Sequence, residues 1–200
     1  MLDSPGRSGF RIGLLPLALA LVAIGLALGG AELTDLLRYQ REAILHGQLW
    51  RLLSAHLLHL GTAHLVLNLA GLGLVWALFA QELSGSTGAW VLLGSALGVG
   101  LGLLLFDPDV EWYVGLSGVL HGLFVAGALR RWRTQPVEAG VMLLVLAGKL
   151  LWEQWLGPLP GTRDAAGGPV IVDAHLFGAA GGALVLGLRR VSGFKAAINK

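Results

Sequence analysis

Six apolar runs separated by short polar segments limit what this chain can fold into. They cover residues 12–31, 52–80, 89–106, 116–130, 136–157 and 170–188. A helix needs about 20 mostly apolar residues to cross a bilayer, and most of these runs approach or exceed that length. Only 13% of the 200 residues are charged, about half the share in a soluble domain. The sequence therefore predicts an all-α integral membrane protein, a bundle of six transmembrane helices.

The first run follows a polar leader with Arg7 and Arg11, an arrangement also found in secretory signal peptides. The run is longer than the apolar segment of a typical signal peptide, and its small residues form no clean cleavage site. We therefore interpret it as a retained helix. The expected organisation is a cytoplasmic N-terminal leader at 1–11, a six-helix domain at 12–190 and a cytoplasmic C-terminal tail at 191–200.

The basic residues favour one side of the predicted membrane. With the N-terminus inside, the inner segments hold nine of the fourteen Lys and Arg residues: Arg7, Arg11, Arg130, Arg131, Arg133, Arg189, Arg190, Lys195 and Lys200. This asymmetry follows the positive-inside rule, so we expect both termini to be cytoplasmic. Membrane topology accounts for the basic residues, and the lipid bilayer is their expected surroundings. We therefore expect no nucleic-acid partner.

The fourth run is unusually short and begins with a serine between two glycines. From Leu116 to Arg130 there are about 14 residues, or roughly 21 Å of helix, whereas the bilayer core is about 30 Å thick. If Arg130 lies at the inner face, Ser117 lies about 10 Å below the outer face. A polar residue at that depth must be buried in protein or face water, and such residues are functional candidates.

Two other runs place polar side chains at the same depth. Counting residues from the inner end of each run puts Asn68 and His175 about 20 Å above the inner face, level with Ser117. His64 lies one turn above Asn68 and shares its helix face. We therefore expect Ser117, His175, His64 and Asn68 to form one polar layer near the outer surface.

This layer contains the groups required for acyl transfer. A serine hydroxyl becomes nucleophilic when a base takes its proton, and His175 is the available base. The Ser117 N–H, at the start of its helix, could donate to an oxyanion together with Asn68 and His64.

Each of these residues also has a structural interpretation. Ser117 could be an N-cap or a helix-packing residue, and His64 with Asn68 could simply stiffen the bundle. His121 could pack one turn below Ser117 or take part in the chemistry. Asp173 lies on a different helix face from His175, so we do not assign it as a triad acid. Two further histidines, His56 and His59, are expected nearer the outer boundary, serving the interface or the loop.

Four short motifs occur in order and resemble those of the rhomboid intramembrane proteases. They are Trp50-Arg51, His64-x-x-x-Asn68, Gly115-Leu116-Ser117-Gly118 and Ala174-His175-Leu176-Phe177-Gly178. The resemblance extends over about residues 50–182. Gly115 and Gly118 would let the backbone turn and a neighbouring helix approach, and Gly178 is a supporting residue of the same kind.

The resemblance implies a Ser117–His175 dyad without a third acidic member. It further implies an oxyanion site made by His64, Asn68 and the Ser117 N–H, with no cofactor or metal. The implied partners are single-pass membrane protein substrates. The implied location is a bacterial inner membrane, with the active site open to the periplasmic or outer side.

One departure from the general pattern narrows this interpretation. His121, within Gly-x-Ser-Gly-x-Leu-His-Gly, replaces the aromatic residue that packs on the catalytic histidine in many rhomboids. This variant is similar to the rhombosortase subfamily, whose members are thought to process surface proteins with a Gly-Gly-type C-terminal anchor. Three alternatives remain: a general rhomboid protease with other single-pass substrates, an inactive rhomboid-like binder of membrane segments, and a protein that uses its histidines to bind metal or haem.

Overall fold

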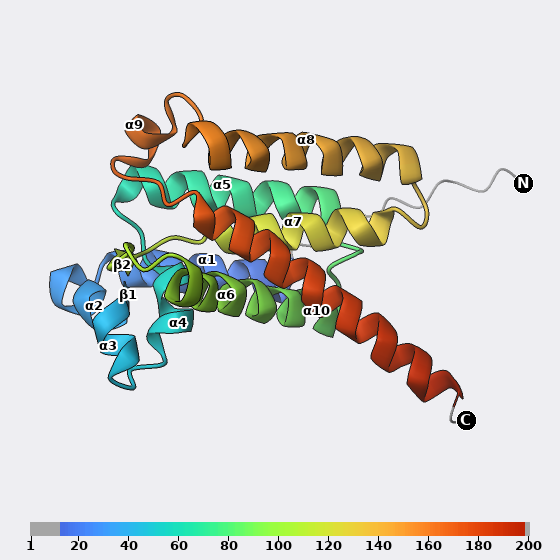
Figure 1. The fold of residues 1–200 in the computed structure, drawn as a ribbon, viewed down its shortest axis with the longest axis horizontal. Coiled ribbons are helices and arrows are strands. Elements are labelled where there is room, and N and C mark those ends of the chain that lie inside the picture. The colour runs from blue at the N-terminus through green and yellow to red at the C-terminus, as the bar shows by residue number, and fades with distance from the viewer. Residues whose placement is uncertain (1–12, 199–200) are drawn as a thin grey trace, which may run out of the picture.

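The computed structural model describes the backbone of residues 13–198 and the side chains of residues 13–189. Its six longest helices lie side by side along the long axis, except that the last crosses the others obliquely (Figure 1). They are α1 (Leu14–Ala27), α5 (Thr62–Phe79), α6 (Ser86–Phe106), α7 (Ser117–Arg131), α8 (Pro136–Leu156) and α10 (Asp173–Ile198). The expected leader at 1–11 lies outside the described residues, and α10 continues to Ile198 through the segment expected as a tail.

The remaining elements are short and lie mainly at one end of the bundle (Figure 1). They are α2 (Gly30–Leu37), β1 (Tyr39–Gln40), α3 (Arg41–Leu45), α4 (Arg51–Ser54), the 3-10 helix η1 (Ala55–Leu57), β2 (Trp112–Tyr113) and α9 (Thr162–Ala166). The two strands pair antiparallel, with Tyr39 opposite Tyr113 and Gln40 opposite Trp112. This pairing joins the segment before α4 to the loop that leads into α7.

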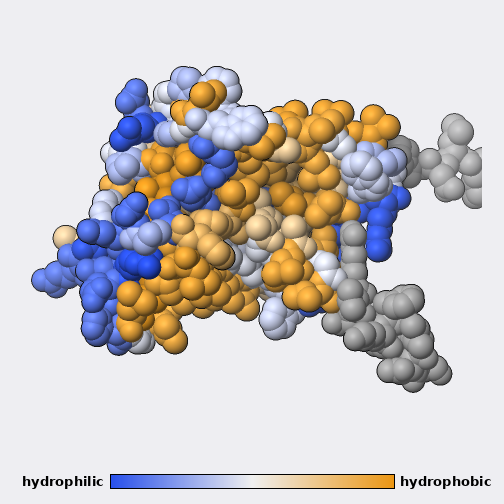
Figure 2. Space-filling view, in the orientation of Figure 1, coloured by the Kyte–Doolittle hydropathy of each residue, from blue (hydrophilic) through white to orange (hydrophobic). Residues whose placement is uncertain are grey.

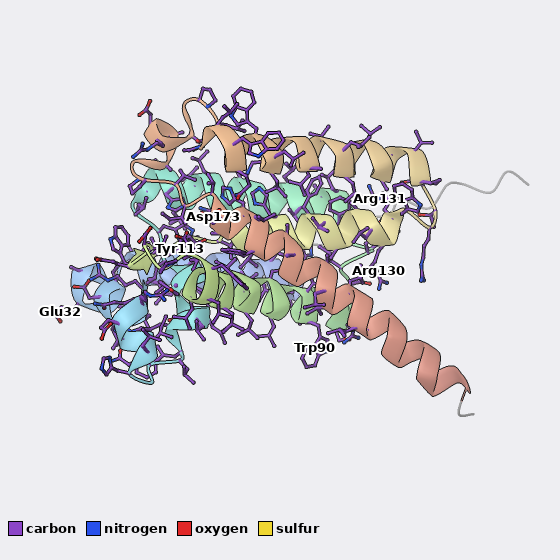
Figure 3. All side chains as sticks on the ribbon, in the orientation of Figure 1. Glu32, Trp90, Tyr113, Arg130, Arg131 and Asp173 are labelled. Carbon is purple, nitrogen blue, oxygen red and sulfur yellow. The ribbon has the colours of Figure 1, made fainter. Side chains whose placement is uncertain are left out.

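The apolar helices form a belt between two polar ends. Figure 2 shows hydrophobic side chains over the middle of the bundle and hydrophilic ones over the end that carries α2 and α3. Figure 3 places Glu32 at that end, with Arg130 and Arg131 toward the other. Among the described helices, α5, α6 and α8 are long and apolar enough to cross a membrane, and α1 is a shorter apolar helix. The chain is thus a helical membrane protein, while six spans and cytoplasmic termini remain predictions.

The sequence suggested one continuous helix over residues 52–80, but the structure shows that this second apolar run is interrupted. Its first part forms α4 and η1, and α5 begins only at Thr62. The His56 side chain explains the break, because it is 3% exposed and its ring nitrogens contact three backbone carbonyls. These belong to Leu52, Ala96 and Gly115, so His56 joins three segments. It is therefore buried within the protein, and its position near the outer boundary stays a prediction.

The Trp50-Arg51 pair anchors the segment before the bundle. Arg51 is buried and donates from Nη1 to the carbonyls of Asp35 and Arg38, both at 2.8 Å. Trp50 Nε1 donates to the Leu36 carbonyl at 3.2 Å. These bonds satisfy the otherwise unpaired carbonyls at the end of α2 and hold the polar end of the molecule together.

Helix α10 lies against α6 and α7 in the centre of the bundle. Small residues permit this packing: a Cβ added to Gly181 would lie 2.4 Å from the Gly94 carbonyl oxygen of α6. Helix α8 is far less enclosed by the rest of the protein. Only 17% of the residues in its most apolar stretch are buried, compared with 39% in α6. It begins with Pro136 in its first turn, where the missing N–H costs nothing.

Candidate active site

Ser117 and His175 meet where α7 and α10 begin. Ser117 is the first residue of α7, and its Oγ lies 3.0 Å from Nε2 of His175. His175 is 5% exposed, whereas Ser117 is only partly buried. This is the geometry in which a histidine can take a serine proton. Two side chains 58 residues apart are therefore brought into the relation that the sequence predicted.

A glycine with a positive φ turns the loop that precedes Ser117. Gly115 has φ +136°, a conformation that side-chain-bearing residues rarely adopt. Its N–H donates to the Ala55 carbonyl at 3.1 Å, and its own carbonyl accepts from the Tyr113 hydroxyl at 2.8 Å. A Cβ at this position would lie 3.0 Å from Cε1 of His64. Gly115 thus serves both the turn and the approach of His64, as expected for a supporting residue.

Two glycines set the distance between α7 and α10. A Cβ added to Gly178 would lie 2.0 Å from the Gly118 carbonyl oxygen, and one added to Gly118 would lie 2.5 Å from that of Ala174. The helix backbones are therefore in direct contact beside the Ser117–His175 pair. The predicted supporting role of Gly118 and Gly178 thus has a geometric basis.

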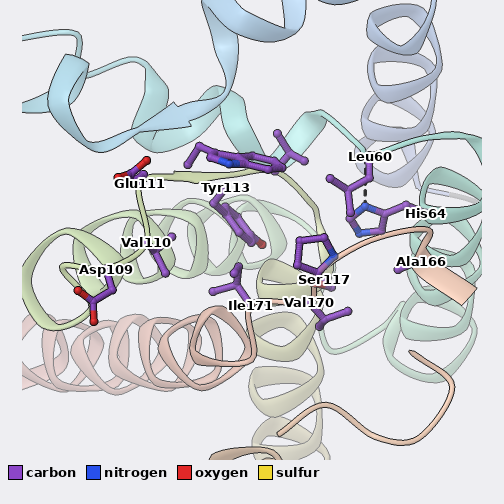
Figure 4. A pocket seen from close by; sticks show the side chains of 13 residues that line it. Leu60, His64, Asp109, Val110, Glu111, Tyr113, Ser117, Ala166, Val170 and Ile171 are labelled. Carbon is purple, nitrogen blue, oxygen red and sulfur yellow. Dashed lines mark hydrogen bonds between the residues drawn. The ribbon is translucent and has the colours of Figure 1, made fainter. Parts of the chain in front are cut away.

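His64 and Asn68 lie beside Ser117 on α5. The Leu60 N–H donates to His64 Nδ1 at 3.2 Å, so the proton of the neutral ring is on Nε2 (Figure 4). Asn68 is 4% exposed and donates one N–H of Nδ2 to the His64 carbonyl at 3.0 Å. Its second N–H remains available for another acceptor. Each side chain therefore has one donor to offer to the space beside Ser117.

Two cavities meet at Ser117 and His64. The first, of about 250 Å³, is lined on the polar side by Asp109, Glu111 and Tyr113 (Figure 4). The second, of about 310 Å³, lies between α5, α7, α8 and α10 and is mostly apolar; Asn68 and His175 also line it. Ser117 thus lines both a polar and an apolar cavity.

The loop residue His59 packs on His64. Their rings lie edge to face with centroids 5.1 Å apart, and both His59 nitrogens are buried without a hydrogen-bond partner in the structure. Burial, together with the neighbouring His64, lowers the pKa of His59 to about 4. His59 is therefore neutral near pH 7.

An acidic residue that the sequence interpretation missed contacts His175. Oε2 of Glu153, on α8, lies 2.9 Å from His175 Nδ1, and its side chain is 2% exposed. Lys149, one turn earlier, places Nζ 2.7 Å from the same oxygen. The sequence analysis expected no acidic partner for His175, whereas the structure places Glu153 beside its ring. The available signal was a Lys and a Glu four residues apart inside an apolar run, a rare pattern in a membrane span.

His121 completes this group on the other side of His175. The two rings are stacked, with centroids 4.3 Å apart and planes at 17°. His121 Nδ1 lies 2.7 Å from the Ser117 carbonyl oxygen, and Nε2 lies 2.7 Å from Lys149 Nζ. Asp173, by contrast, makes no hydrogen bond to the His175 ring that the structure describes.

The same group has the spacing of a metal site, which bears on the metal alternative. Ligand atoms of His121, Glu153 and His175 lie within 4.8 Å of one another. Lys149 Nζ, however, lies 2.7, 2.7 and 3.1 Å from those three side chains. An ammonium group therefore occupies the point on which the ligands converge, and a metal ion would have to displace it. The residues fit an internal ion pair better than a metal centre.

A comparison with protein families matches most of the chain. The family model described as Rhomboid domain matches residues 46–190 of the chain. This range includes α5 to α8, most of α10 and every residue of the site described above. No curated protein matches the chain at a significant level.

Proposed function

The chain belongs to the rhomboid family of intramembrane proteases, and on that premise we propose that it is a serine endopeptidase in which His175 activates Ser117. The observation that carries this proposal is the 3.0 Å contact between Ser117 Oγ and His175 Nε2. An inactive binder of membrane segments would have no need to keep this pair in hydrogen-bond contact.

The proposed reaction proceeds in two acyl-transfer steps. His175 Nε2 takes the Ser117 proton while Oγ attacks the carbonyl carbon of the scissile bond, giving a tetrahedral oxyanion. When this intermediate collapses, the C–N bond breaks, and His175 returns the proton to the leaving amine. His175 then takes a proton from water, whose oxygen attacks the carbonyl carbon of the acyl-enzyme. The bond between this carbon and Ser117 Oγ breaks, His175 returns the proton to Oγ, and the new carboxyl terminus is released.

The oxyanion would be bound by donors from two helices. The Ser117 N–H belongs to the first turn of α7, where backbone donors have no intrahelical partner. His64 and Asn68, both on α5, line the apolar cavity beside Ser117, and each would contribute its remaining side-chain N–H. Donors positioned in advance are worth about 10²–10³ in rate each.

The two cavities suit a substrate that comes from the membrane. The apolar cavity between α5 and α8 would receive the membrane segment, and the cavity lined by Asp109 and Glu111 would supply water. Substrates would then be single-pass proteins cut near the outer end of their anchor. Because cleavage needs extended backbone and glycine disfavours helix, the proposed class is C-terminal anchors with a Gly-Gly-type motif, as in the rhombosortase subfamily.

A fluorophosphonate probe tests the nucleophile without knowledge of the substrate. The purified protein should be labelled at Ser117, and Ser117→Ala should remove the label. Labelling at another residue, or equal labelling of Ser117→Ala, would refute the proposal. The substrate class is tested separately by co-expression with a Gly-Gly-type anchored protein and mass spectrometry of its C-terminus. Cleavage only of other single-pass proteins would point to a general rhomboid protease.

A further inference from the structure

Helix α8 is the least enclosed of the three helices that are long and apolar enough to cross a membrane. It contains an ion pair that activation of Ser117 by His175 does not itself require. Glu153 and Lys149 are one turn apart on α8, and Glu153 is 2% exposed although its neighbours on the helix are mostly apolar. Ionised groups in a membrane span are costly, so a pair kept there should serve the site that it contacts. That site is His175.

The hydrogen-bond partners of His121 and His175 are consistent with one assignment of their ring protons. The Ser117 carbonyl only accepts, so His121 donates to it from Nδ1 and leaves Nε2 as an acceptor for the Lys149 ammonium. The Glu153 carboxylate only accepts, so His175 donates to it from Nδ1. His175 Nε2 is then left unprotonated, facing the Ser117 hydroxyl.

Lys149 holds this arrangement together. Its Nζ donates to Glu153 Oε2 and to His121 Nε2, both at 2.7 Å. The 3.1 Å approach to His175 Nδ1 is then a close contact between two donors that share the Glu153 acceptor. At rest the group is neutral, with one ammonium and one carboxylate. When His175 accepts the Ser117 proton, the carboxylate lies 2.9 Å from the new charge.

From this geometry we infer that Glu153 is a positioning residue that fixes the orientation and tautomer of His175, with Lys149 as its counter-ion. The inference rests on the proposed function and deepens it, because it turns the serine–histidine pair into a Ser117–His175–Glu153 triad contributed by three helices. His121 belongs to the same network: it stacks on His175 and links Lys149 to the Ser117 backbone.

Labelling rates of charge variants test the inference. Glu153→Gln keeps the shape and removes the charge, and its rate of fluorophosphonate labelling should fall about 10²–10⁴-fold, the range typical of lost acid–base assistance. The matched control is Glu138→Gln on the same helix, where the carboxylate pairs with Arg131 away from the site. This control should label at the wild-type rate.

A double variant separates positioning from charge balance. If Glu153 only neutralised Lys149, then Lys149→Met combined with Glu153→Gln would remove both charges and restore labelling. The inference predicts instead that the double variant labels as slowly as Glu153→Gln alone. Restored labelling in the double variant would overturn it, as would wild-type labelling of Glu153→Gln. Both outcomes require a labelled wild-type Ser117 and thus differ from failure of the proposed function itself.

The wild-type protein gives a second test, which does not depend on the folding of any Glu153 or Lys149 variant. Nitrogen-15 NMR of histidine-labelled protein distinguishes protonated from unprotonated ring nitrogens, and the His175 signals are assigned by their loss in His175→Ala. The expected spectrum has a proton on Nδ1 and none on Nε2. The opposite tautomer would refute a positioning role for Glu153, even if Glu153→Gln proved too unstable to study.

Discussion

The contact between α7 and α10 makes one substitution especially informative, because Gly178→Ala adds a methyl group where there is no room. The new Cβ would lie 2.0 Å from the Gly118 carbonyl oxygen, whereas a carbon–oxygen contact needs about 3.3 Å. The neighbour is helix backbone, so α10 must move away from α7 by roughly 1.3 Å. We expect overpacking of this kind to lower the free energy of unfolding by about 1–3 kcal/mol.

The same movement should reduce activity, because Ser117 and His175 are contributed by the two helices that separate. Displacements of about 1 Å at a reacting centre can cost roughly 100-fold in rate. We therefore expect Gly178→Ala to label with fluorophosphonate about 100-fold more slowly, measured on folded protein at a temperature below its thermal transition.

Gly187→Ala, also on α10, is the matched control. A Cβ at Gly187 meets nothing within 4 Å, so the change should stabilise the helix by about 0.5–1 kcal/mol and leave labelling unchanged. The argument from helix contact fails if Gly178→Ala matches Gly187→Ala in both thermal stability and labelling rate.

Three further predictions concern the oxyanion donors, a loop histidine and the topology. His64→Ala and Asn68→Ala should each slow Ser117 labelling about 10²–10³-fold, and the double variant should cost less than the sum because both donors serve one charge; full additivity would argue against a shared oxyanion. Burial lowers the pKa of His59 to about 4 in the folded protein, so the stability that its neutral form contributes should be present above about pH 6.5 and fall by about 2 kcal/mol by pH 5. His59→Phe should flatten the pH dependence of Tm between pH 7 and 5. A cysteine at Lys200 should be modified only from the cytoplasmic side, and labelling from outside would reverse the predicted topology.

The sequence alone determined the features that depend on one helix at a time. Apolar length located the helices, and the constant helical rise placed Ser117, Asn68 and His175 at one depth, because depth along an axis requires only residue counting. The contact between Ser117 and His175 agrees with that prediction for these two residues. The start of α5 was misplaced, because the apolar run continued through residues that turn inward around His56.

Only the tertiary structure decided which faces of the helices meet. Residue counting gives depth but not rotation about the helix axis, and rotation is set by packing, such as the contact of Gly178 with Gly118. The sequence therefore showed Lys149 and Glu153 as an isolated pair within an apolar run, with nothing to say what they face. In the folded bundle α8 turns them toward His175, because the costly burial of a carboxylate needs an ammonium and an imidazole beside it.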